Sequence, residues 1–238
     1  FNDILDAKSD RQHPIKKSRP IASGDLPVGI ALVEAVVLAA MALYLAHILN
    51  PLFFAAVTTY LVLQVLYSLG LKNISIIDIL VIASGFILRI YAGAFVINAH
   101  LSVWFLLCVI SVALFLASGK RRAELNINGS ENHPTRKSLR AYPRELLNSY
   151  VTMFGNAAWM SWALFTFFES PKASLPVWLF LAEISKATTI NKLLMFTIPI
   201  VIFGIMRYEN LIFEEKSEAP EKILLTDIPL MTSAVIFS

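Results

Sequence analysis

Long apolar stretches, separated by short polar segments, dominate this chain of 238 residues. A stretch of about 20 apolar residues is long enough to cross a bilayer as a helix. The stretches that reach or approach this length cover roughly residues 28–49, 51–70, 76–98, 101–118, 148–168, 193–207 and 228–238. Residues 175–182 are apolar but too short to span, and they predict an interfacial helix. Because no strand-like alternation stands out, the pattern predicts an all-α, polytopic transmembrane helix bundle.

Composition supports an integral membrane protein. The chain is 57% hydrophobic and only 16% charged, whereas soluble domains carry about 25% charged residues. The sequence pI of about 9.0 does not indicate nucleic-acid binding, because the basic residues lie in short segments between apolar stretches. The single cysteine, Cys108, excludes an intrachain disulfide and a cysteine-based zinc site.

The distribution of basic residues predicts the orientation in the membrane. Sixteen of the 20 Lys and Arg residues fall in the segments 8–25, 71–75, 119–147 and 207–227, which would lie on one face. An excess of Lys and Arg marks cytoplasmic loops. We therefore expect a multi-pass plasma-membrane protein whose polar site assembles on the cytoplasmic face.

The first ten residues carry an acidic stripe. At 100° per residue in a helix, Asn2, Asp3, Asp6 and Asp10 fall within about a quarter-turn of one another. Carboxylates this close repel unless a cation lies between them, and a hard divalent cation with oxygen ligands would serve. The alternative without a bound metal is a helix end with solvated carboxylates, which the negative end of the helix dipole disfavours. The stripe therefore predicts a metal-phosphate site.

Basic residues that could bind phosphate follow this stripe directly. They are Arg11, Lys16, Lys17 and Arg19.

A second polar cluster comprises Tyr67, Lys72, Asp78 and Arg89. Asp78 lies near the cytoplasmic start of its predicted helix, and Arg89 lies three turns deeper. A charged side chain at that depth is costly and by default marks a functional cavity. The alternative is an arginine that is satisfied by neighbouring oxygens and simply holds helices together.

A third cluster follows the apolar stretch 101–118. Lys120, Arg121 and Arg122 stand together, Glu124 lies close behind them, and Arg136 and Arg140 form an i, i+4 pair further along. These cations could bind phosphates bidentately. Equally, three cations at the end of a spanning helix could serve only as a topology anchor.

The motif Asn2-Asp3-x-x-Asp6-x-x-x-Asp10, followed by Arg11-x-His13-Pro14-x-Lys16-x-x-Arg19-Pro20, resembles the first aspartate motif of the UbiA superfamily of intramembrane prenyltransferases. The resemblance implies a bundle of nine transmembrane helices, about seven of them covered here. It also implies a single transmembrane catalytic domain over residues 1–238, with one or two further helices upstream of Phe1. Typical members hold a prenyl diphosphate through Mg²⁺ at two aspartate-rich motifs.

The chain departs from that pattern after residue 118, where Lys120-Arg121-Arg122-Ala123-Glu124-Leu125 stands in place of a second aspartate-rich motif. The chain is similar to the decaprenyl-phosphate phosphoribosyltransferase branch in this basic segment. The similarity extends to the sequences around Tyr67–Asp78 and Gly85–Gly93 and to the late Arg207-Tyr208 and Asp227. In that branch the diphosphate belongs to phosphoribosyl pyrophosphate, and the acceptor is a polyprenyl phosphate. The product would feed cell-wall arabinan precursor synthesis.

The resemblance implies a role for each candidate residue. Asp3, Asp6 and Asp10 would be the catalytic residues that hold Mg²⁺. The substrate-binding residues would be Asn2, Arg11, Lys16, Arg19, Tyr67, Lys72, Asp78, Arg89, Lys120, Arg121, Arg122, Glu124 and Arg140. Two alternatives stay open: a prenyltransferase that uses a prenyl diphosphate donor, and a membrane transporter or lipid-binding protein without chemistry. The sequence also leaves homo-oligomerisation open.

Overall fold

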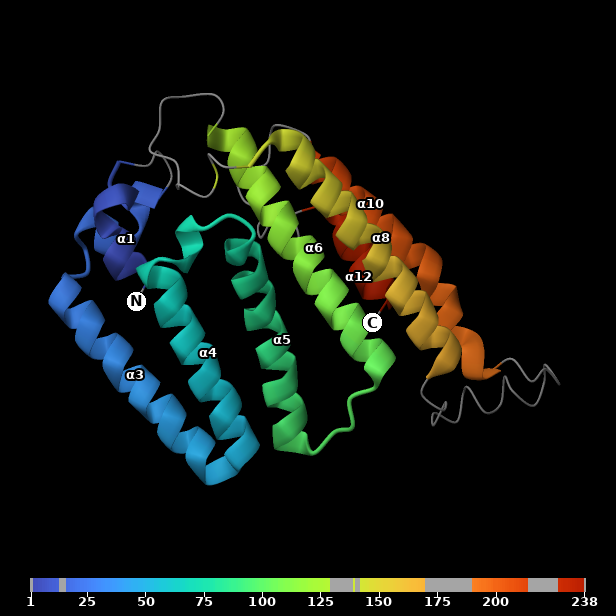
Figure 1. Cartoon of the computed structure of the whole chain (residues 1–238), viewed down its shortest axis with the longest axis horizontal. Coiled ribbons are helices and arrows are strands. Elements are labelled where there is room, and N and C mark those ends of the chain that lie inside the picture. Colours follow the sequence, from blue (N-terminus) through green and yellow to red (C-terminus); the bar gives the residue numbers. More distant parts are fainter. Residues whose placement is uncertain are drawn as a thin grey trace. The chain divides into compact units, whose positions relative to one another are not determined.

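The computed structural model describes residues 2–12, 16–128, 139, 142–169, 190–213 and 227–237, and every regular element among them is helical. In chain order these elements are α1 Asn2–Asp10, η1 Lys16–Ser18, α2 Pro20–Ser23, α3 Val28–Leu49, α4 Pro51–Leu69, η2 Leu71–Asn73, α5 Ile77–Ile97, α6 Val103–Asn128, α8 Arg144–Phe168, η3 Ile190–Thr197, α10 Ile198–Phe213 and α12 Ile228–Phe237 (Figure 1). Each predicted apolar segment contains a helix, which confirms the all-α fold. The predicted interfacial helix at 175–182 lies outside the described residues.

Several helices are long and apolar enough to cross a membrane. Within the described residues, the spans that meet this condition are Val28–Leu49, Pro51–Leu69, Ile77–Ile97, Val103–Leu125 and Leu194–Phe213. Helix α3 exposes many large apolar side chains on its surface. Its side chains Val33, Leu38 and Ile48 are apolar and more than half exposed, as expected for a helix that faces lipid. The protein is therefore a multi-pass membrane protein.

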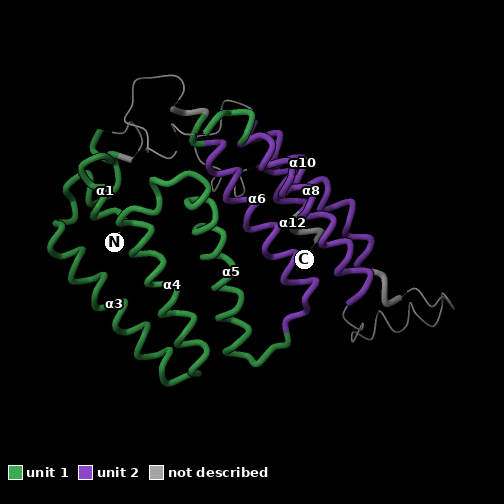
Figure 2. The backbone as a smooth tube through the Cα atoms, in the orientation of Figure 1, with its two compact units in different colours: residues 1–100, 124–146 green, residues 101–123, 147–238 purple. Residues whose placement is uncertain are grey.

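The chain groups into two compact units (Figure 2). Unit 1 contains residues 1–100 and 124–146, and unit 2 contains residues 101–123 and 147–238. The division falls within α6, so the last turns of that helix are counted with unit 1. Each unit is described separately below.

In unit 1, α4 packs against both α3 and α5, and α1 contacts α4 and α3. Asn50 forms the tight turn between α3 and α4. Its side-chain oxygen accepts a hydrogen bond from Leu52 N at 2.8 Å, and its amide donates to Phe95 O of α5 at 3.3 Å. Pro51 follows as the first residue of α4, where a missing N–H costs nothing. Asn50 therefore caps the start of α4 and links this turn to the C-terminal end of α5.

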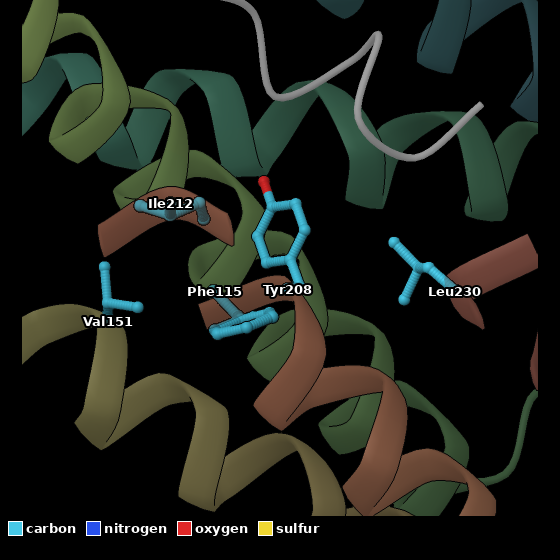
Figure 3. Packing of buried hydrophobic residues seen from close by; sticks show 5 residues of the cluster. All are labelled: Phe115, Val151, Tyr208, Ile212 and Leu230. Atoms are coloured by element: carbon cyan, nitrogen blue, oxygen red, sulfur yellow. The ribbon is translucent and has the colours of Figure 1, made fainter. Parts of the chain in front are cut away.

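In unit 2, the core joins four helices. Phe115 of α6, Val151 of α8, Tyr208 and Ile212 of α10, and Leu230 of α12 form one buried cluster (Figure 3). Gly119 lets α6 approach α10 closely, because a Cβ there would lie 2.7 Å from Ile212 Cδ1.

Helix α6 continues further than the sequence predicts. The apolar stretch ends near residue 118, and the segment from 119 was expected to be a loop. The structure instead continues the helix through Lys120, Arg121 and Arg122 to Asn128. The physical reason is that Lys, Arg, Ala, Glu and Leu are all good helix formers, so the helix extends beyond the end of the apolar stretch. The basic cluster therefore lies on a rigid helix.

Candidate metal and phosphate site

Helix α1 presents its acidic residues on one face. Arg19 Nη1 lies 2.8 Å from Asp3 Oδ1 and 3.0 Å from Asp10 Oδ2, so a single guanidinium bridges residues two turns apart. Asp10 is buried at the C-terminal end of the helix. Because the helix dipole is negative at that end, a carboxylate there needs a compensating cation, and Arg19 supplies it. The arrangement agrees with the predicted stripe.

Lys72 brings the second predicted cluster to this acidic face. It lies in η2 and is only 7% exposed. Its ammonium donates hydrogen bonds to Asp6 Oδ1 and, at 3.4 Å, to Asn2 Oδ1. The sequence separates Lys72 from Asp6 by 66 residues. The fold of unit 1 therefore assembles one site from two polar segments that were identified independently.

The donor set of α1 suits a hard divalent cation, which prefers carboxylate and amide oxygens. The oxygens of Asp3 and Asp10 already converge on one positive nitrogen. Within the described residues no three His, Cys, Asp or Glu side chains are grouped as a metal site, and Asp6 faces Lys72. In the structure, Asp3 and Asp10 therefore converge on Arg19, and Asp6 pairs with Lys72 beside them.

The other basic residues near α1 are placed differently. Arg11 donates from Nε to Ala22 O at 3.2 Å, so it fastens the end of α2. Gly24 terminates that short helix with a left-handed φ of 95°, which favours glycine. Lys16 begins η1, but its side chain lies outside the described part of the chain.

Asp78 occupies the first turn of α5 and is 0% exposed. Its Oδ1 accepts a hydrogen bond from the Tyr142 hydroxyl at 2.8 Å and another from Ile79 N at 2.9 Å. The same Tyr142 hydroxyl accepts a hydrogen bond from Ile76 N. Tyr67, the remaining member of this cluster, is also buried at the end of α4.

Arg89 lies on α5 within a predicted span. Its guanidinium donates to Tyr60 Oη at 2.5 Å and lies 5.0 Å from the centre of the Tyr60 ring and 5.6 Å from that of Phe86. Contacts of this type offset part of the cost of a cation at membrane depth. The hydrogen bond to Tyr60 is the arrangement that the packing alternative predicts, and Arg89 is exposed in the structure.

The basic cluster of α6 is buried within the protein. Arg121 is 0% exposed and Arg122 is nearly as buried. Arg122 Nε donates to Asn148 Oδ1 of α8 at 2.5 Å, and its guanidinium lies 5.4 Å from the centre of the Phe213 ring. Lys120 and Glu124 are half-buried. A topology anchor needs only solvated cations, so Arg121 and Arg122 lack the exposure that this alternative predicts.

Two predicted cations of the third cluster, Arg136 and Arg140, lie outside the described residues. At the end of unit 2, Arg207 pairs bidentately with Asp227, at 3.2 Å from Nε to Oδ1 and 2.7 Å from Nη2 to Oδ2. The hydrogen bond from Arg207 lowers the pKa of the Asp227 carboxyl, and a further bond from Leu230 N acts in the same direction. Asp227 thereby also caps α12.

Sequence reasoning missed Tyr142 and Asn148 as partners of charged residues. A tyrosine just before a spanning helix looks like any tyrosine at a membrane interface. Asn148 stands in an ordinary helical pattern. Only the buried charges of Asp78 and Arg122, which need partners, give an indirect signal that such residues exist.

Comparison with known proteins gives the family. Residues 1–124 match the UbiA prenyltransferase family. Decaprenyl-phosphate phosphoribosyltransferase of Corynebacterium glutamicum is 40% identical over 168 residues, which cover 70% of this chain and 51% of the relative. The enzyme of the same name from Mycobacterium tuberculosis is 36% identical over 166 residues, 70% of this chain and 55% of the relative. The chain thus spans about half the length of these curated relatives.

A solved structure shows the same fold. The structure of a UbiA homologue from Archaeoglobus fulgidus bound to DMAPP and Mg²⁺ matches with a TM-score of 0.71 at 16% identity, covering 99% of this chain and 78% of that chain. This match supports the fold, and the family match covers the acidic helix, Lys72 and the basic cluster of α6. The chain therefore belongs to the UbiA prenyltransferase family.

Proposed function

We propose that this chain carries out a phosphoribosyl transfer, from phosphoribosyl pyrophosphate to a polyprenyl phosphate of decaprenyl type, with release of diphosphate. Relatives that are 36–40% identical bear the name decaprenyl-phosphate phosphoribosyltransferase. The observation that carries the proposal is the arrangement in unit 1, where Lys72 and Arg19 meet the acidic face of α1. The product would serve cell-wall arabinan precursor synthesis.

Mg²⁺ is the proposed cofactor. The Archaeoglobus fulgidus homologue was solved with Mg²⁺ and prenyl diphosphates, and the oxygen donors of α1 suit this ion. Asp3, Asp6 and Asp10, with Asn2 in support, would hold the ion. When bound, it would supply positive charge for the diphosphate as that group departs.

The chain's own cations have a matching task. Lys72 and Arg19 donate hydrogen bonds to carboxylates on α1, and the same groups can donate to diphosphate oxygens, since charge-assisted bonds to phosphate are strong. These residues would orient the donor and stabilise the leaving group. An oxygen of the lipid phosphate then forms a bond to the anomeric carbon. The bond from that carbon to the diphosphate breaks, and its electron pair leaves with the diphosphate.

No general base is required, because the attacking phosphate is already an anion. The donor's 5-phosphate and the lipid phosphate are two further anions that need cations. The proposed phosphate-binding residues are Arg11, Lys16, Arg89, Lys120, Arg121, Arg122 and Arg140, with Tyr67, Asp78 and Glu124 in support. The one-sided distribution of Lys and Arg supports an active site on the cytoplasmic face of the plasma membrane.

A radiolabel experiment tests this function. Purified protein in detergent is incubated with Mg²⁺, a polyprenyl phosphate and phosphoribosyl pyrophosphate labelled in the ribose. We expect label in the lipid phase with the wild type and none with Asp6→Asn. The rival reaction predicts lipid-phase product only when a prenyl diphosphate is the donor, so absence of ribose label from the lipid would contradict the proposal.

A further inference from the structure

The turn that joins Lys72 to α5 has an unusual backbone. Ile76 has φ 71° and ψ −49°, a region that β-branched residues rarely adopt. Such strained residues persist only where the surroundings determine them. Strain at this position therefore indicates that another part of the chain holds the turn.

Among the described residues, Tyr142 makes hydrogen bonds to this turn. Its hydroxyl accepts a hydrogen bond from Ile76 N and donates one to Asp78 Oδ1 at 2.8 Å. These two bonds fasten both sides of the start of α5 through a single oxygen. Tyr142 is 5% exposed and Asp78 is 0% exposed, so water cannot easily replace the hydroxyl. Buried polar groups that lose a partner pay the full cost of desolvation.

The other end of this turn carries Lys72. Asn73 N donates to Gly70 O at 2.9 Å, and Asp78 N donates to Ile74 O at 3.1 Å, so the backbone is bonded continuously from the end of α4 to the start of α5. A shift at Ile76 therefore moves η2 and the ammonium that contacts Asp6. Catalytic geometry tolerates only about 0.5 Å of such error.

We propose that Tyr142 is a positioning residue that fixes Lys72 against the acidic face of α1 and thereby sets the affinity of this site for a metal-bound diphosphate. The inference rests on the proposed function, because that function requires the site to bind the donor's diphosphate. Tyr142 directly precedes Pro143 and α8. In this role Tyr142 acts through the backbone of Ile76 and the carboxylate of Asp78.

Tyr142→Phe isolates the hydroxyl and keeps the ring. The matched control is Tyr150→Phe, which removes the hydroxyl of a tyrosine of α8 whose ring packs on Phe154. The probe is Mg²⁺ with inorganic pyrophosphate, titrated calorimetrically into the full chain in detergent micelles. We expect the dissociation constant to rise about tenfold in Tyr142→Phe, as loss of a buried charge-assisted bond implies, and to stay at the wild-type value in Tyr150→Phe.

A double variant separates positioning from general destabilisation. If Tyr142 acts through Lys72, then Tyr142→Phe should weaken binding less than twofold further in a Lys72→Ala background, by the logic of a thermodynamic cycle. If Tyr142→Phe lowers the affinity tenfold in both backgrounds, or if it binds as tightly as the wild type, this inference is overturned and the proposed function is not. Failure of the wild type itself to bind Mg²⁺ and pyrophosphate would instead overturn the proposed function, and this inference with it.

Discussion

Lys72→Met tests the ion pair at the centre of the site. The substitution keeps most of the length of the unbranched apolar stem and removes the charge. In the structure, the Lys72 side chain is 9% exposed and the Asp6 side chain is 16% exposed. The variant therefore leaves a largely buried carboxylate without its ammonium partner. Removal of one member of a buried pair is destabilising because the remaining charge is uncompensated.

The expected size follows from this burial. Loss of a hydrogen bond to a charged group costs about 1.5–3 kcal/mol. Because Asp6 keeps some access to water, we expect about 2 kcal/mol. For a chain of this length each kcal/mol lowers the melting temperature by about 2–4 °C, so Lys72→Met should melt about 4–8 °C below the wild type in detergent.

A second substitution separates stability from function. Lys72→Met combined with Asp6→Asn removes both charges of this ion pair, so this double variant should recover most of the lost melting temperature while staying inactive in phosphoribosyl transfer. Lys8→Met is the matched control, since Lys8 is an exposed lysine of α1, the helix that carries Asp6. A melting temperature of Lys72→Met equal to that of the control would refute the reasoning. So would a double variant that melts below Lys72→Met.

Three further predictions concern unit 2. If the proposed phosphate contact of Lys120 is made, Lys120→Ala should raise the KM for the donor or for the lipid about fivefold to tenfold, because a half-buried cation would contribute about 1 kcal/mol to such a contact; saturation curves with both substrates check this. Gly119→Ala should lower the melting temperature by a few degrees, because its Cβ would lie 2.7 Å from Ile212 and overpacking costs about 1–3 kcal/mol, partly offset by helix propensity. The pKa of Asp227 is lowered by Arg207 from its ordinary 3.8, so the stability that the ionised carboxyl contributes is present above about pH 4 and is lost as the pH falls below that value. The melting-temperature difference between wild type and Asp227→Asn should therefore be constant near neutral pH and shrink below about pH 4.

Each of these predictions has an outcome that contradicts it. Unchanged saturation curves for both substrates would make Lys120 a topology anchor. Gly93→Ala is the control for the glycine, because beyond the adjoining residues and the local helix backbone no atom of the described residues lies within 4 Å of the Cβ position there; equal melting of both alanine variants would contradict the packing argument. A difference for Asp227→Asn that grows on acidification would reverse the sign derived for the ion pair.

The helices were predictable because their signal is local. A continuous apolar stretch has few alternatives to a spanning helix, and Asn50-Pro51 marks a turn by known capping chemistry. The end of α6 was missed because apolarity ends before the helix does. There, the good helix formers Lys120 to Leu125 extend it beyond the apolar stretch.

The site was predictable in part. The spacing of Asp3, Asp6 and Asp10 fixes their common face without any tertiary information. The pairing of Lys72 with Asp6 depends on how η2 folds back toward α1, which no local pattern encodes. Tyr142 was missed for the same reason, because its role comes from a tertiary contact with the start of α5.

Competition between the two donor types tests the central claim most directly. Purified protein receives Mg²⁺, phosphoribosyl pyrophosphate, a prenyl diphosphate, a polyprenyl phosphate and an aromatic acceptor in one reaction, and mass spectrometry identifies the lipid products. The proposal predicts that the polyprenyl phosphate gains one phosphoribosyl group and that the aromatic acceptor stays unprenylated. A prenylated aromatic product, with the polyprenyl phosphate unchanged, would contradict it.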